Sequence, residues 1–136
     1  MIKGTQPKFE NVMIIDDNVI DLYIPSRMII KNNFGKNVME YSDAQEALKY
    51  LQENQENIAA LPQIIFIDIY MPVMSGFDFL EAYDKLSLTL KNYCKAYVLS
   101  STIDNEDITR SFNDKNVVAF HVKPITKEIL DRITLD

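Results

Sequence analysis

The sequence predicts an α/β protein built on a parallel β-sheet. Short apolar runs, typical of strands buried on both faces, alternate with longer segments that carry apolar residues at helical spacing. This alternation predicts helices that connect parallel strands by right-handed crossovers. The clearest strand is Ile64–Asp68, in which four apolar residues lead to one carboxylate. A buried strand does not hold an unpaired charge along its length, so we expect Asp68 at the carboxyl end, where open α/β sheets bind ligands.

The strands are expected where apolar runs end at polar or turn-forming residues. Five are predicted, at Val12–Ile15, Lys36–Tyr41, Ile64–Asp68, Ala96–Leu99 and Val117–Val122. The second is short and of mixed polarity, which favours an edge position, and it is the only one whose composition indicates an edge.

The helices are expected between and after these strands. Five are predicted, at about Val19–Asn33, Ala44–Gln55, Gly76–Leu90, Asp104–Asn113 and Thr126–Ile133. In the first, Pro25 removes a helix hydrogen bond, so that helix is expected to begin late or to kink near Asp21. The second begins with a capping box in which Ser42 is the N-cap and Gln45 lies three residues on.

The remaining helices have their own start signals. The third begins at Ser75-Gly76-Phe77-Asp78, and its apolar stripe consists of Phe79, Tyr83, Leu86 and Leu90. Acidic residues at 104, 106 and 107 favour the start of the fourth through the helix dipole. Thr126 is expected to cap the last helix.

Length and composition indicate one globular domain. The chain has 136 residues, of which 47% are hydrophobic. The first ten, with Gly4 and Pro7, are expected to be a flexible lead-in to a domain at 11–136.

The net charge of −6 argues against nucleic-acid binding, which needs clustered Lys and Arg. No signal peptide or membrane-spanning run is recognisable, and the single Cys94 suits a reducing compartment, so a cytoplasmic location is expected.

Polar side chains directly follow four of the predicted strands. They are Asp16, Asp17, Asp68, Ser100 and Lys123. Because the carboxyl ends of parallel strands meet at one edge of a sheet, these side chains are expected in one crevice. Three carboxylates there would repel one another unless a cation were bound, and oxygen ligands without His or Cys favour Mg²⁺ over Ca²⁺. With an ammonium group and a hydroxyl beside it, such a site suits a phosphoryl group.

Each of these residues also has an ordinary structural interpretation. A lone Asp after a strand is often a helix cap, a lone Ser more often so, and a lone Lys is usually a solvated charge. Their joint occurrence at four strand ends is what favours a functional site. His121 is interpreted as structural and Cys94 as inert, because neither has a ligand partner in the pattern.

At these positions the sequence resembles the receiver domain of two-component response regulators, from about Asn11 to Ile133. The motifs that carry the resemblance are Ile15-Asp16-Asp17, Asp68-Ile69-Tyr70-Met71-Pro72 with Ser75-Gly76, Leu99-Ser100-Ser101 and Val122-Lys123-Pro124. The resemblance implies a flavodoxin-like (βα)5 three-layer sandwich with strand order 2-1-3-4-5. It also implies a cis peptide bond between Lys123 and Pro124.

The resemblance implies that Asp68 is a phosphoacceptor, which takes the phosphoryl group from a phosphohistidine of a sensor histidine kinase or phosphotransfer protein. It implies that Asp17, Asp68 and the backbone carbonyl of Tyr70 bind Mg²⁺ directly. Asp16 would then act mainly through metal-bound water.

The resemblance also implies a switch. Lys123 pairs with the phosphoryl group, Ser100 hydrogen-bonds it in the active form, and Phe120 occupies an aromatic switch position on the last strand. Ser101 stands where a smaller Ala is usual in the family, and this is expected to narrow access to the phosphoryl group. Tyr70 and Thr102 line the path of attacking water, and we expect Tyr70 to slow hydrolysis by shielding.

Because the sequence shows no output domain, we expect a single-domain response regulator that signals by binding a downstream protein, which the sequence does not identify. The expected readout surface is the fourth helix, last strand and last helix, and the resemblance also allows a homodimer through that face. The protein is not expected to be an enzyme that acts on a separate substrate, because the receiver phosphorylates and dephosphorylates itself.

Two alternatives remain open. One is a receiver-like scaffold that is never phosphorylated. The other is a phosphohydrolase of the haloacid dehalogenase type, although that family has a second Asp two residues after the nucleophile, where this chain has Tyr70.

Overall fold

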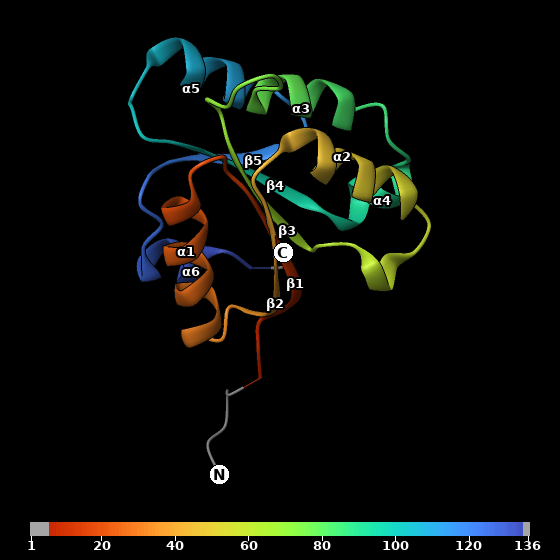
Figure 1. Ribbon diagram of the computed structural model, residues 1–136, viewed down its shortest axis with the longest axis vertical. Helices are drawn as coiled ribbons and strands as arrows, with labels where there is room; N and C mark the ends of the chain where they lie inside the picture. Colours follow the sequence, from red (N-terminus) through yellow and green to blue (C-terminus); the bar gives the residue numbers. More distant parts are fainter. Residues whose placement is uncertain (1–5, 135–136) are drawn as a thin grey trace.

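A five-stranded parallel sheet forms the centre of the structure (Figure 1). The computed structural model describes residues 6–134. The strands are β1 (Phe9–Ile15), β2 (Gly35–Tyr41), β3 (Ile64–Asp68), β4 (Lys95–Ser100) and β5 (Val117–Val122). Their order is β2-β1-β3-β4-β5, and every neighbouring pair is parallel. The predicted flavodoxin-like order 2-1-3-4-5 is confirmed.

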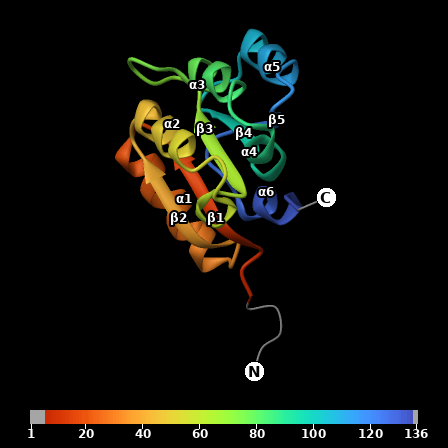
Figure 2. The same ribbon diagram turned by 90° about the vertical axis from the view of Figure 1, so that its right-hand side faces the viewer.

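Helices cover both faces of this sheet (Figures 1 and 2). They are α1 (Val19–Lys31), α2 (Ala44–Glu53), α3 (Gly76–Tyr83), α4 (Leu88–Tyr93), α5 (Asn105–Phe112) and α6 (Lys127–Arg132), with a 3-10 turn at Ile58–Ala60. The helices α1 and α6 pack on one face, and α2, α3 and α4 on the other. The expected three-layer sandwich is therefore present. None of the helices in the described part is long and apolar enough to cross a membrane.

The apolar runs of β1 and β3 are buried on both faces. Met13 and Ile15 of β1, with Ile65 and Ile67 of β3, join the cluster under α2, α3 and α4. The alternate residues of both strands join the cluster under α1 and α6. Side chains of successive strand residues point to opposite faces, so an unbroken apolar run is what a strand between two helical layers requires.

The sheet has an edge at each end. The strand β2 is one edge, as predicted, and β5 is the other, with half-buried residues along most of its length. A register shift pairs Ala96 with Val117 but Tyr97 with Ala119, so Val118 is an extra residue in β5. Past this bulge Phe120 lies opposite Val98 and packs on the α3 side.

The N-terminal part is more ordered than expected. The first strand begins at Phe9, which is buried, rather than at Val12. Lys8 donates hydrogen bonds to the carbonyl oxygens of Leu130 and Ile133, at 3.1 and 2.9 Å, and so caps the end of α6. The predicted flexible lead-in over 1–10 is therefore wrong from residue 8 onward, and its residues 1–5 lie outside the described part of the chain.

Two helix starts differ from the predictions. The helix α1 begins at Val19, capped by Asn18, and continues through Pro25, so the expected late start is wrong. The N-cap of α2 is Asp43 and not Ser42, because the Asp43 carboxylate accepts from the Gln45 N–H at 2.7 Å. The predicted capping box with Ser42 as the N-cap is therefore wrong, and the cap lies one residue later. Ser75 and Thr126 cap α3 and α6 as expected.

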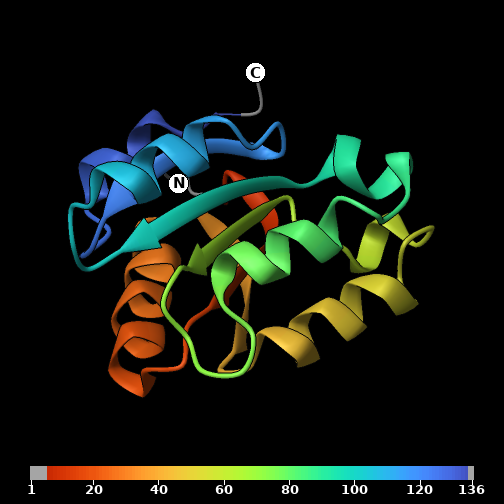
Figure 3. The same cartoon turned by 90° about the horizontal axis from the view of Figure 1, so that it is seen from above.

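The predicted third helix is two helices, α3 and α4, which Figure 3 shows as separate segments. The chain leaves α3 at Asp84, and Ser87 caps α4. All four residues of the predicted stripe are nevertheless buried in the same cluster. The apolar spacing therefore predicted burial correctly but not continuity of the helix.

Gly76, the first residue of α3, lies against the end of β3. A Cβ atom added to Gly76 would be 2.4 Å from the backbone oxygen of Asp68 and 2.9 Å from Cα of Ile69. The Gly76 N–H also donates to the Ile69 carbonyl at 2.8 Å. This close approach of two backbones determines where the strand end that carries Asp68 lies.

We predict that Gly76→Ala lowers the free energy of unfolding by roughly 1–3 kcal/mol, because the new methyl group meets backbone atoms that cannot move without displacing Asp68. Gly35→Ala is the matched comparison, since its Cβ would be 2.7 Å from a methyl carbon of the Val12 side chain. Urea unfolding of both variants should show the larger loss for Gly76→Ala. A larger loss for Gly35→Ala would contradict this account.

Candidate functional site

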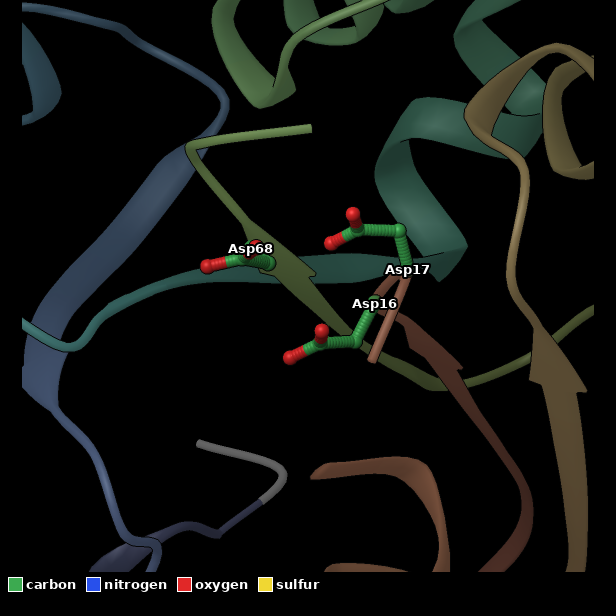
Figure 4. Close-up of side chains that lie close together, drawn as sticks. All are labelled: Asp16, Asp17 and Asp68. Atoms are coloured by element: carbon green, nitrogen blue, oxygen red, sulfur yellow. The ribbon is translucent and has the colours of Figure 1, made fainter. Parts of the chain in front are cut away.

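Three carboxylates meet at the carboxyl ends of β1 and β3. Asp16 and Asp17 directly follow β1, and Asp68 is the last residue of β3. Each offers an oxygen within 4.8 Å of the others, and the side chains extend to the same side (Figure 4). Asp16 and Asp68 are buried, whereas Asp17 is exposed. The sequence predicted this grouping because parallel strand ends share one edge.

Lys123, just after β5, brings a positive charge to these carboxylates. Its Nζ lies 2.5 Å from Oδ2 of Asp16 and 3.1 Å from Oδ1 of Asp68. The Lys123 backbone N–H donates to the Ser100 carbonyl at 2.8 Å, which holds the ends of β4 and β5 together. The Lys123–Pro124 peptide bond is cis, as expected.

Asp21 also contacts Lys123, with its Oδ2 3.0 Å from Nζ, and the sequence interpretation missed this role. Asp21 lies in the first turn of α1, four residues after Asp17. The sequence indicated that α1 begins close behind the acidic pair, but it did not indicate which residue of the first turn contacts Lys123. Asp21 was expected only to mark the position of a kink in the first helix.

Burial and mutual repulsion shift the protonation of the carboxylates. Burial, followed by the negative charge of Asp16, raises the pKa of Asp68 to about 6, although Lys123 opposes the shift. Burial also raises the pKa of Asp16 above its ordinary value. Burial alone would lower the Lys123 pKa, but its hydrogen bonds to Asp16 and Asp21 raise it overall. Lys123 is therefore a permanent cation, and the negative charge of the site is incompletely balanced.

The Ser100 hydroxyl is buried but turned toward its own loop. Its Oγ accepts a hydrogen bond from the Thr102 N–H at 3.1 Å and lies 3.3 Å from the Thr102 hydroxyl. The structure therefore places Ser100 at the edge of the site, and its hydroxyl makes no hydrogen bond to Asp68 or Lys123. Ser101 lines a cavity of about 220 Å³ beside Asp16 and Lys123.

The other predicted site residues lie around this centre. Tyr70 follows Asp68 by two residues, is half exposed, and donates its hydroxyl hydrogen bond to Asp107 of α5. Phe120 is half-buried against the α3 side of the core. His121 stacks on Tyr97, with ring centres 6.1 Å apart, on the opposite face of the sheet. Cys94 is buried, which raises the pKa of its thiol to about 12 and agrees with an inert residue.

The family model described as the response regulator receiver domain matches residues 12–134 of this chain. The match includes every strand-end residue of the site. This chain belongs to the response regulator receiver domain family.

This chain is similar in sequence and in fold to known proteins. The crystal structure of a two-component response regulator from Cytophaga hutchinsonii has a TM-score of 0.84 and 25% identity, and covers 91% of this chain and 92% of that one. The "Probable methanogenesis regulatory protein FilR2" of Methanothrix harundinacea is 23% identical over 89% of this chain and 76% of its own length. The Arabidopsis thaliana protein ARR13 is 31% identical over 90% of this chain, but the chain spans only 20% of that protein.

Receiver domains are signalling domains rather than conventional enzymes. They bind Mg²⁺ through an acidic pocket and interact with histidine kinases or phosphotransfer proteins. In this chain, the carboxylates of Asp16, Asp17 and Asp68 form an acidic pocket at the strand ends.

We predict that Asp68→Asn stabilises the metal-free receiver domain at pH 7.5 by roughly 1–3 kcal/mol. The folded pKa of about 6 lies above the ordinary value of 3.8, so the folded state binds the proton more tightly than the unfolded state. Protonated Asp68 therefore stabilises the folded state. This stabilisation is complete below about pH 4 and is lost as the pH rises through 6.

Urea unfolding in chelator at pH 5 and pH 7.5 tests this expectation. The advantage of Asp68→Asn should shrink at pH 5 and should reverse when Mg²⁺ is added, since bound metal stabilises the folded wild type. The control is Asp43→Asn, because Asn caps α2 as well as Asp does. An Asp68→Asn variant no more stable than wild type at pH 7.5 in chelator would refute the prediction.

Proposed function

We propose that this receiver domain accepts a phosphoryl group on Asp68 from the phosphohistidine of a sensor kinase or phosphotransfer protein, with Mg²⁺, and acts as a single-domain response regulator. The observation that carries the proposal is the environment of the Asp68 carboxylate. It is buried at a strand end, beside the carboxylates of Asp16 and Asp17, and Lys123 lies 3.1 Å away. A carboxylate held between an acidic pair and an ammonium group is suited to attack a phosphorus atom.

The donor set fits Mg²⁺, because the acidic pocket offers only oxygen ligands. Both oxygens of Asp16 already accept hydrogen bonds, from the Asn18 N–H and from Lys123. Asp17 is exposed and accepts none within the described part of the chain. This difference supports direct binding by Asp17, with Asp16 acting through water. Asp68 and the backbone carbonyl of Tyr70 are the other proposed direct ligands. Bound Mg²⁺ would offset the charge of the carboxylates and of the phosphoryl oxygens.

In the proposed transfer, a carboxylate oxygen of Asp68 attacks the phosphorus atom. The bond between phosphorus and the histidine nitrogen breaks, and its electron pair stays on the imidazole of the donor. Lys123 stabilises the negative charge on the phosphoryl oxygens from its position beside Asp68. The Ser100 hydroxyl would have to leave Thr102 to hydrogen-bond the phosphoryl group.

This movement of Ser100 would bias a two-state equilibrium that includes Phe120. Phe120 pairs with Val98, which lies two residues before Ser100 on β4. Phe120 and Ser100 therefore lie on neighbouring strands at the β5 end of the sheet. Exposed apolar residues on α5 and β5, at Phe112, Val118 and Val122, support a readout surface formed by α5, β5 and α6. That face would bind a downstream protein or a second copy of the chain.

Two other functions are less well supported. A haloacid dehalogenase mechanism requires a carboxylate as general acid at position 70, where this chain has a tyrosine whose hydroxyl is bonded to Asp107. A scaffold that is never phosphorylated does not need Asp16, Asp17, Asp68 and Lys123 together, since burying like charges costs stability.

We predict that incubation with Mg²⁺ and acetyl phosphate adds one phosphoryl group, detected by intact-protein mass spectrometry. The adduct should be absent from Asp68→Asn and when Mg²⁺ is chelated, because Asp68 is the nucleophile and the acidic pocket needs the cation. An adduct that persists in Asp68→Asn would overturn the assignment of Asp68. No adduct from either acetyl phosphate or a kinase, with Mg²⁺ binding demonstrated, would favour the scaffold.

We predict that Tyr70→Asn shortens the lifetime of the phosphorylated form, because a smaller side chain leaves the path of attacking water more open. The rate of phosphoryl loss is measured by mass spectrometry after acetyl phosphate has been removed. The control is Tyr23→Asn, which changes an equally exposed tyrosine on α1. An unchanged rate in Tyr70→Asn would remove the shielding role.

A further inference from the structure

The helix α5 has few apolar contacts to hold it in place. Of its residues Asn105–Phe112, only Ser111 is buried, and Phe112 is exposed. A helix that buries so little apolar surface depends on specific side-chain contacts for its position. The contacts of α5 are therefore informative about what it does.

Figure 1 shows α5 next to α3. Two side-chain contacts of α5 reach the segment from Tyr70 to Phe77 that follows Asp68. The Tyr70 hydroxyl donates a hydrogen bond to the carboxylate of Asp107. One turn further on, the guanidinium carbon of Arg110 lies 4.2 Å from the ring centre of Phe77 in α3. Residues three apart share one face of a helix, so Asp107 and Arg110 form one contact surface toward the β3–α3 segment.

The Tyr70 side chain lies beside the loop that connects β4 to α5. Its hydroxyl reaches Asp107 beyond that loop, and the Thr102 hydroxyl lies close enough to influence its pKa. Thr102 in turn contacts the hydroxyl of Ser100. The contact of Ser100 with Thr102 thus lies in the loop before α5, and the bond from Tyr70 to Asp107 lies in the first turn of α5.

Asp107 is well suited to hold the Tyr70 hydroxyl in place. It is half-buried and lies in the first turn of α5, where the helix dipole favours a negative charge. A hydrogen bond from a phenol to a carboxylate is charge-assisted and stronger than one between neutral groups. Without this acceptor, the half-exposed Tyr70 ring would be free to adopt other rotamers.

We propose that Asp107 is a positioning residue that holds Tyr70 across the mouth of the phosphoryl site, so that a side chain of α5 sets how long Asp68 stays phosphorylated. The inference rests on the proposed function. In the step that it slows, a water oxygen attacks phosphorus and the bond from phosphorus to the Asp68 oxygen breaks. The electron pair returns to the Asp68 carboxylate, and inorganic phosphate and a proton are released to solvent.

The test measures phosphoryl loss in wild type, Tyr70→Phe, Asp107→Ala, Asp107→Asn and the double variant Tyr70→Phe/Asp107→Ala. Each protein is loaded with Mg²⁺ and acetyl phosphate, acetyl phosphate is removed, and intact mass is followed with time. Tyr70→Phe and Asp107→Ala should each speed phosphoryl loss about threefold or more, and the double variant should be no faster than either. Asp107→Asn keeps an acceptor oxygen for the Tyr70 hydroxyl and should restore a rate close to wild type.

The matched control is Glu106→Ala. Glu106 is an exposed acid in the same turn of α5, and its side chain makes no hydrogen bond or ion pair in the described part of the chain. Its removal changes the helix charge as Asp107→Ala does, but it should leave the lifetime unchanged. The proposal would be overturned if Asp107→Ala kept the wild-type lifetime. It would also be overturned if the two single effects multiplied in the double variant, or if Asp107→Asn lost its phosphoryl group as fast as Asp107→Ala.

A second measurement tests the contact without phosphorylation. In metal-free protein, Tyr70→Phe and Asp107→Ala should accelerate amide hydrogen exchange of α5 equally, while Asp107→Asn and Glu106→Ala should not. Failure to load a phosphoryl group on wild type would count against the proposed function, whereas unchanged α5 exchange in Tyr70→Phe and Asp107→Ala would count against the positioning contact itself.

Discussion

The site depends on one interaction, the contact of the Lys123 ammonium with the buried carboxylates of Asp16 and Asp68. Burying these carboxylates without a counter-charge would cost several kcal/mol each. A single ammonium group balances them only in part. Burial, followed by the negative charge of Asp16, raises the pKa of Asp68 to about 6. The protein gives up some stability to keep negative charge at this edge of the sheet, which is the condition for binding a cation and a phosphoryl group.

The sheet supplies the geometry that this interaction needs. Parallel strands bring the ends of β1, β3 and β5 to one edge, and the Lys123 N–H joins β5 to the carbonyl of Ser100. On the β3 side, the absence of a side chain at Gly76 lets α3 begin against the backbone of Asp68. In a regular strand, Val117 and Phe120 would lie on opposite faces of the sheet. Here both face the α3 side, because the bulge at Val118 reverses the alternation of side chains along β5.

The helix α5 connects this rigid centre to the outer surface. It buries little apolar area and contacts the β3–α3 segment through Asp107 and Arg110. A weakly packed helix attached next to the proposed phosphoacceptor can change position at low energetic cost. The contact between Tyr70 and Asp107 therefore offers a route between the chemistry at Asp68 and the proposed readout face, beside the one through Ser100 and Phe120.

The sequence by itself determined the sheet, its parallel arrangement and the grouping of carboxylates with Lys123. Strands buried on both faces are readable as apolar runs, and polar residues at their ends must share an edge. Only the tertiary structure decided the contact of Asp21 with Lys123, the bond from Tyr70 to Asp107 and the bulge at Val118. Each depends on a partner far away in the chain or on the neighbouring strand, and local periodicity carries no information about such pairs.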